Sequence, residues 1–271
     1  MAVKLKMTIL VENTVYKQGL LAEHGLSIYL EFDGKKYLFD SGQGLSLKHN
    51  AQKLGIALNE LDGLILSHGH YDHTGGVPYL LEIKSDLEIY AHPDFQIERY
   101  SMRGKRLAPV SYSGPAIKDF NEIRNLSEIG KNMFLTGEIK NAKNYLNKKY
   151  MRKNNSGYIT DNFSDDLSLY FESKDGLIII LGCSHKGVEN IIKEIINKSG
   201  LSRVDKIIGG MHLMNADKNR LKNLSEFFKE INPNEIYPLH CSGKEAASYF
   251  RRSLGDKIKF AGVGSIIEGE I

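Results

Sequence analysis

The sequence predicts an α+β fold in which two mixed β-sheets pack face to face and helices cover their outer faces. Two observations carry this prediction. A β-hairpin signal opens each half of the chain, with turns at 33–34 and 174–176, and each hairpin leads into alternating strands and helices. Elements in that order are typical of two sheet layers enclosed by helices. No linker or short-period repeat interrupts the chain, so we expect a single domain over residues 1–271.

Hydrophobic periodicity identifies the elements of the first half. Apolar residues alternate in the first strand, and helical spacing after the hairpin ends at Gly55, a typical residue after a helix. The expected elements are a strand at 5–11, the hairpin Ser27–Phe32 with Lys35–Phe39, a helix at Leu45–Leu54, a strand at Asp62–Leu66, a helix at Val77–Ile83 and a strand at Leu87–Ala91.

The second half repeats this organisation after residues 94–160, a segment in which the hydrophobic residues show little regular spacing. In Val188–Lys198, isoleucines recur at three- and four-residue intervals, as in an amphipathic helix. The expected elements are the hairpin Leu167–Glu172 with Leu177–Leu181, that helix, a strand at Val204–Ile208, a helix at 217–231, a strand at Glu235–Leu239 and a helix at Lys244–Phe250.

Composition excludes several classes of protein. The chain is 41% hydrophobic and 25% charged, with a net charge of +3 and scattered Lys and Arg, which does not favour nucleic-acid binding. Its longest apolar run, near 176–181, is too short to span a membrane, and the first residues lack a signal-peptide core. We therefore expect a cytoplasmic protein that acts on a small molecule, without nucleic-acid or membrane partners. The oligomeric state is left open.

The most informative segment is 67–76, which reads SHGHYDHTGG directly after the apolar Leu64–Leu66. Four potential metal ligands lie within six positions: His68, His70, Asp72 and His73. Imidazole nitrogen together with carboxylate oxygen suits zinc, iron(II) or manganese. A short glycine-bearing loop after a buried strand lets several such side chains converge. The sequence therefore predicts a metal centre here.

This motif resembles that of the metallo-β-lactamase superfamily of metal-dependent hydrolases, whose fold is an αββα sandwich with metals at one edge of the sheets. The resemblance implies that His68 and His70 face metal one, and that Asp72 and His73 face metal two. Asp40, in a strand-end Asp-x-Gly, is then expected to accept the free ring N–H of a ligand histidine and fix its tautomer.

Three later histidines each follow an apolar strand: His185, His212 and His240. By the same resemblance, His185 would complete metal one and His240 metal two. His212 is expected to be a ligand or a substrate contact. The centre is thus expected to hold two divalent metal ions, zinc first, with manganese or iron as alternatives.

The bridging aspartate of the superfamily has no counterpart in this chain. Cys183 follows Gly182 and could replace it, because a thiolate is a good zinc ligand; the alternative is a small buried residue. Cys241 is interpreted as a bystander. His24 lies in a loop that could cover the metals, or is simply exposed.

Six segments narrow the resemblance to one subgroup, named after a synthase that joins a dihydropterin to a ribofuranosyl-aminobenzene phosphate. These segments are Ala22–Ser27, Phe39–Gly42, Ser67–Gly76, Gly182–His185, Gly209–Leu213 and His240–Gly243. The subgroup resemblance covers about residues 7–243 and is weakest between 100 and 160.

The expected activity is that of a metal-dependent hydrolase. Two cations that share a water lower its pKa from near 16 toward roughly 7, which supplies hydroxide for attack on a phosphorylated or otherwise anionic small molecule. Asp72 would be the catalytic residue that positions this nucleophile. One alternative is a transferase that joins a pterin diphosphate to a ribofuranosyl-aminobenzene phosphate. The other is a non-catalytic metal-binding module.

Residues 94–160 are expected to form a lid-like insert over the metal edge, because loops carry specificity on a rigid scaffold. Arg99, Arg103 and Arg106 are spaced by four and three residues, which predicts a shared helical face. They would supply cationic contacts to a phosphorylated substrate. The alternative is a solvated basic helix.

Overall fold

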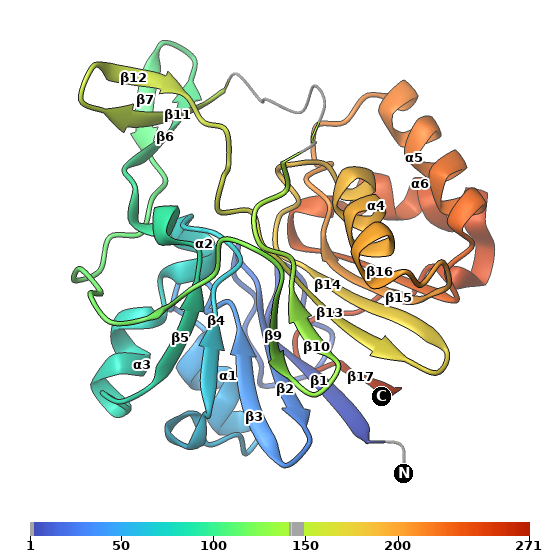
Figure 1. Cartoon of the computed structure of the whole chain (residues 1–271), viewed down its shortest axis with the longest axis horizontal. Coiled ribbons are helices and arrows are strands. Elements are labelled where there is room, and N and C mark those ends of the chain that lie inside the picture. The colour runs from blue at the N-terminus through green and yellow to red at the C-terminus, as the bar shows by residue number, and fades with distance from the viewer. Residues whose placement is uncertain (1–2, 141, 143–148) are drawn as a thin grey trace.

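The computed structural model describes residues 3–140, 142 and 149–271. Figure 1 shows two β-sheets facing each other, with α1 and α3 outside one sheet and α4, α5 and α6 outside the other. The first sheet has the strand order β17-β1-β2-β3-β4-β5-β8, and the second has the order β16-β15-β14-β13-β10-β9. Both sheets mix parallel and antiparallel pairs, so the predicted αββα sandwich is confirmed.

The first sheet contains the predicted N-terminal hairpin and adds two strands that the sequence did not reveal. β17 and β8 extend its edges, and β17 brings the end of the chain back against β1. Its strands are β1 (Lys4–Val11), β2 (Ser27–Phe32), β3 (Lys35–Phe39), β4 (Gly63–Ile65), β5 (Glu88–Ala91), β8 (Asn121–Glu122) and β17 (Ile266–Glu270). The helices of this half are α1 (Leu47–Lys53), α2 (Tyr71–Thr74) and α3 (Val77–Ile83), with short 3-10 turns at Leu58–Glu60 and Pro93–Gln96.

The second sheet starts from an antiparallel hairpin and continues into parallel strands joined by helices. Its strands are β9 (Ser127–Gly130), β10 (Met133–Leu135), β13 (Ser168–Ser173), β14 (Gly176–Leu181), β15 (Val204–Gly210) and β16 (Glu235–Leu239). The helices are α4 (Val188–Ser199), α5 (Lys218–Ile231) and α6 (Lys244–Leu254), with 3-10 turns at His240–Ser242 and Gly255–Lys257. No helix within the described residues is long and apolar enough to cross a membrane.

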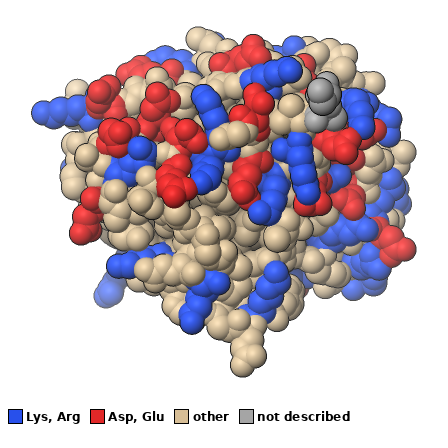
Figure 2. All heavy atoms as spheres, turned by 90° about the horizontal axis from the view of Figure 1, so that it is seen from below, with Lys and Arg blue, Asp and Glu red and all other residues tan. Residues whose placement is uncertain are grey.

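Three hydrophobic clusters fill the three interfaces between the four layers of the sandwich. The central cluster lies between the sheets, where Phe32 and Phe171 meet edge to face at 5.1 Å. A second cluster packs β14 and β15 against α4, α5 and α6, and a third packs β3 and β4 against α1 and α3. On the outside, Figure 2 shows acidic and basic side chains interleaved over much of one face, as the scattered charges of the sequence suggest.

The segment 94–160, expected as a lid-like insert, contains strands where its arginines were predicted to share a helical face. Its strands β6 (Arg99–Arg103), β7 (Arg106–Pro109), β11 (Tyr150–Asn154) and β12 (Gly157–Thr160) form a separate four-stranded sheet that projects from the sandwich (Figure 1). The prediction that the three arginines share a helical face is wrong, because Gly104, with φ of 63°, turns the chain into a hairpin. Residues 141 and 143–148 of the predicted insert lie outside the described residues.

Arg99 anchors this projecting sheet instead of facing a substrate. Its side chain is buried, with Nε 2.7 Å from an oxygen of Asp161 and Nη2 2.7 Å from an oxygen of Asp165. The other carboxylate oxygen of Asp165 accepts a 2.8 Å hydrogen bond from the backbone N–H of Gly69, inside the metal motif. The substrate contact expected for Arg99 is therefore not what the structure shows, because its buried guanidinium is paired with Asp161 and Asp165 and links the projecting sheet to the metal loop.

Replacing Arg99 with Met is expected to lower the free energy of unfolding by about 3–5 kcal/mol, because it leaves two buried carboxylates without their cation. Urea unfolding checks this value. Arg106→Met, on the exposed partner strand, is the matched control and should change stability by less than about 0.5 kcal/mol. Equal effects of the two substitutions would contradict the anchoring role.

Candidate metal centre

The predicted ligands lie at one edge of the sandwich, where parallel strands of both sheets end. β4 leads into the loop of the SHGHYDHTGG motif, and β14, β15 and β16 run parallel to one another. The loops that follow these three strands carry, in order, Cys183 with His185, His212 and His240. The sequence places these residues far apart, and the sheet topology brings them together.

A first group consists of His68, His70 and His185. Their ring centroids lie 4.6 to 4.9 Å apart, and all three side chains are buried. Burial lowers the pKa of His70 to about 3 and holds the pKa values of the other two well below the usual range. Nε2 of each ring has no hydrogen-bond partner within the described residues. Buried nitrogens without partners are rare, and neutral rings that carry them fit a cation. The ligand atoms of His68 and His185 lie within 4.8 Å of each other and of Cys183, and the His70 ring packs beside them.

A second group consists of Asp72, His73, His240 and His24. The Nε2 atoms of His73 and His240 lie 3.2 Å apart, and Asp72 Oδ2 lies 3.4 Å from His240 Nε2 and 3.1 Å from His24 Nε2. Although burial disfavours a charged ring, the neighbouring Asp40 carboxylate raises the pKa of His73 to about 9. A cation that binds His73 would therefore compete with a proton for this ring.

The sulfur of Cys183 lies between the two groups. It forms one trio of potential ligands with His68 and His185 and another with His73 and His240. The ligand atoms of each trio lie within 4.8 Å of one another. Its distance to His73 Nε2 is 3.2 Å. Burial raises the pKa of this thiol. One side chain shared by two donor groups is the arrangement that a bridging ligand requires.

Cys241, interpreted from the sequence as a bystander, also belongs to this edge. Cys183, His212 and Cys241 form a further trio with ligand atoms within 4.8 Å, and the backbone N–H of His212 donates to Cys241 Sγ over 3.2 Å. Both thiols are free and buried.

Asp40 holds two histidines of the motif on the Nδ1 side of their rings, directly for His73 and through Ser67 for His68. Its Oδ2 lies 2.6 Å from His73 Nδ1 and accepts a 2.7 Å hydrogen bond from the Ser67 hydroxyl. That hydroxyl lies 2.9 Å from His68 Nδ1. Because the Nδ1 side of both rings is engaged, Nε2 of each ring faces the centre, as expected when a carboxylate orients metal-binding histidines.

Two residues near the N-terminus position the last histidine and were missed by the sequence interpretation. Asn13 Oδ1 lies 3.0 Å from His240 Nδ1, and Glu12 Oε1 accepts a 2.7 Å hydrogen bond from the His240 backbone N–H. Asn13 Nδ2 also lies 3.3 Å from His24 Nδ1. No local pattern could have revealed these contacts, since Glu12 and His240 are 228 positions apart.

The backbone at this edge is tightly constrained. A Cβ atom at Gly182 would lie 2.2 Å from the Ser67 hydroxyl, and one at Gly69 would lie 1.7 Å from the Phe95 carbonyl oxygen, so only glycine fits. Positive φ angles occur at four polar residues here: Asp40 (57°), Ser184 (58°), His212 (51°) and His240 (48°). Such strained conformations cluster at functional sites.

Residues of both donor groups line a cavity of about 460 Å³. Its walls include Tyr150 and Lys149 from the projecting sheet and Arg220 from α5. The Tyr150 ring stacks on His70 with 5.3 Å between centroids, and Arg220 is held by Glu189 through two contacts of 2.6 and 2.7 Å. Tyr150 and Lys149 are therefore the described residues of the 94–160 insert that line this cavity. Arg99, which was expected to contact the substrate, does not line it.

An αββα sandwich with buried His, Asp and Cys donors at one edge defines a class of metal-binding proteins. A family model described as the metallo-beta-lactamase superfamily matches residues 21–139. The chain is 30% identical to an uncharacterized protein from Methanocaldococcus jannaschii, over 96% of this chain and 98% of that one. The chain belongs to the metallo-beta-lactamase superfamily.

Two further similarities are more specific. The 7,8-dihydropterin-6-methyl-4-(beta-D-ribofuranosyl)-aminobenzene-5'-phosphate synthase of Methanocaldococcus jannaschii is 28% identical, over 93% of this chain and 92% of the synthase. The crystal structure of Tm1679, described as a metal-dependent hydrolase of the beta-lactamase superfamily, is 28% identical, with a TM-score of 0.82 over 98% of this chain and 100% of that one.

Proposed function

We propose that this protein is a metal-dependent hydrolase that acts on a phosphorylated or otherwise anionic small molecule. The observation that carries the proposal is the convergence of two buried donor groups on the single sulfur of Cys183. His68, His70 and His185 would hold metal one, and Asp72, His73 and His240 would hold metal two. Zinc suits these donors best, and manganese or iron are alternatives.

Bound cations would supply Lewis acidity and a water that ionises near neutral pH. The chain supplies the remaining groups. Burial opposes ionisation of Asp72, yet hydrogen bonds from His24 and His240 hold its pKa well below the usual range. Its carboxylate thus stays charged and can orient the attacking water or hold its proton. His212 and Tyr150 line the same cavity and can contact the substrate.

The proposal is tested by assaying the purified, zinc-loaded protein against a panel of phosphomonoesters, phosphodiesters and thioesters, with and without a chelator. Chelator-sensitive turnover that falls on the order of 10²–10⁴-fold in Asp72→Asn is the expected result, in line with the loss of a positioned acid–base group. Metal content is measured on the same samples. Absence of turnover on the whole panel by fully loaded protein would refute hydrolysis.

A transferase activity is the second candidate, favoured by the similarity to a synthase over nearly the whole chain. The same metals would then bind a diphosphate leaving group. Incubation with a dihydropterin diphosphate and a ribofuranosyl-aminobenzene phosphate separates the candidates. A transferase releases diphosphate only when both compounds are present, a hydrolase acts on one alone, and a non-catalytic metal-binding module changes neither.

The projecting sheet serves as a lid in this proposal, through Lys149 at its base. Lys149→Gln is expected to raise KM for phosphorylated substrates about threefold to tenfold, since one charge-assisted hydrogen bond is lost, without changing metal content. Lys105→Gln, exposed at the hairpin turn between β6 and β7, is the matched control. Steady-state kinetics decide, and an unchanged KM in the Lys149 variant would refute this contact.

A further inference from the structure

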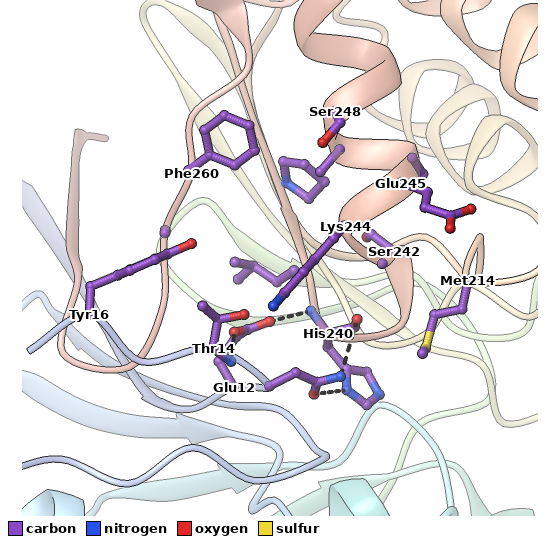
Figure 3. A pocket seen from close by; sticks show the side chains of 17 residues that line it. Glu12, Thr14, Tyr16, Met214, His240, Ser242, Lys244, Glu245, Ser248 and Phe260 are labelled. Carbon is purple, nitrogen blue, oxygen red and sulfur yellow. Dashed lines mark hydrogen bonds between the residues drawn. The ribbon is translucent and has the colours of Figure 1, made fainter.

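His240 also lines a second cavity, of about 630 Å³ (Figure 3). Its walls come from residues 12–16, the turn His240–Ser242, the first turns of α6 and residues 260–261. It shares His240 and Met214 with the cavity of the metal centre. The second cavity is therefore adjacent to the metal centre, and its volume suits a small ligand.

Two aromatic side chains at this cavity stay exposed although their backbones are fixed. Tyr16 is 68% exposed and Phe260 is 58% exposed. The segments that carry them are joined by a bridge between Val15 and Val263, and the Val263 N–H donates to the Thr14 carbonyl over 2.9 Å. In Figure 3 both rings lie on one side of the cavity, opposite Met214 and Glu245. Exposed rings held on a rigid support are suited to stacking on a planar partner.

The cavity also presents a cation. Lys244, the first residue of α6, is exposed and extends across the cavity toward Thr14 (Figure 3). Glu12, near the metal side, accepts hydrogen bonds from the backbone N–H groups of His240 and Thr14. The Lys244 ammonium can bind an oxygen of a ligand, and the carboxylates of Glu12 and Glu245, which line the same cavity, are the competing charges.

We propose that this cavity, the Tyr16–Phe260 pocket, is a specificity subsite for a planar aromatic ring that carries an anionic oxygen. The ring packs against Tyr16 and Phe260, and its oxygen pairs with Lys244. The link to catalysis rests on the proposed function, since the reacting group of the same substrate would lie at the metals beyond His240. Ring binding itself requires no turnover.

The test is calorimetric titration of the metal-loaded protein with β-naphthoate, a planar aromatic carboxylate, and with cyclohexanecarboxylate as the non-planar control. Saturable binding of β-naphthoate is expected, with a Kd about tenfold higher in the double variant Tyr16→Leu, Phe260→Leu. Lys244→Gln is expected to raise Kd about threefold. Tyr158→Leu, at another exposed aromatic residue, is the matched control and should leave Kd unchanged.

Saturating inorganic phosphate, which competes at the metals, should not displace β-naphthoate. Displacement by phosphate, equal Kd values for the two carboxylates, a double variant that binds like the wild type, or no binding to the wild type would each overturn the subsite. Failure of phosphate-ester turnover would instead remove only the proposed hydrolase function, because the titration does not depend on it.

Discussion

Replacing both His68 and His70 with alanine is expected to remove one metal equivalent and to lower kcat/KM on the order of 10³-fold or more. These residues supply two of the three buried nitrogens of the first donor group, and neither Nε2 atom has another partner within the described residues. Without them the remaining His185 and Cys183 cannot complete a tetrahedral site. The reaction then loses several kcal/mol of charge stabilisation that a cation gives the transition state.

Elemental analysis of the double variant measures this effect independently of any substrate. His49→Ala provides the control, because His49 is a half-buried residue of α1 whose Nε2 lies 2.8 Å from the Gly19 carbonyl oxygen and contacts none of the candidate ligands within the described residues. Circular dichroism confirms that each variant is folded. If the double variant holds as much metal as the wild type, the assignment of the first donor group is wrong.

The parts of the fold and site that the sequence predicted are those with local signals. The hairpin β2–β3 is specified by its Asp33-Gly34 turn, and α4 by its isoleucine period, so each forms where expected. Four of the candidate ligands, from His68 to His73, lie within one loop and the short helix α2 that follows it. Their convergence needs only a strand that ends at the right edge, which is why the motif could be interpreted from the sequence.

The parts that the sequence did not predict depend on contacts between distant segments. Spacings of three and four residues are typical of a helix, yet Arg99 and Arg103 lie on one strand because the projecting sheet pairs β6 with β11. Asn13 follows β1 of the first sheet, and His240 follows β16 of the second. Their contact therefore depends on how the two sheets pack together. Tyr150 has no motif of its own and reaches His70 through the same projecting sheet.

Replacing Cys183 with alanine is expected to weaken binding of the second metal equivalent by at least about 100-fold. This loss of affinity is larger than the loss that usually follows replacement of a residue that only hydrogen-bonds to a metal ligand. Among the described residues, the Cys183 sulfur belongs both to the trio with His68 and His185 and to the trio with His73 and His240. Cys183→Asp should recover two metal equivalents, since a carboxylate also bridges cations. Cys241→Ala is the matched control: its thiol is equally buried but belongs only to the trio with His212.

The cobalt-substituted protein gives a readout that does not depend on activity. A thiolate-to-metal absorption band is expected in the wild type and in Cys241→Ala, and it should be absent in Cys183→Ser. Metal binding should also release protons, because burial raises the pKa of the Cys183 thiol and Asp40 raises the pKa of His73 to about 9. Both groups bind a cation only when deprotonated, so metal affinity should fall as the pH is lowered. A thiolate band that persists in Cys183→Ser and disappears in Cys241→Ala would assign the bridge to the other cysteine.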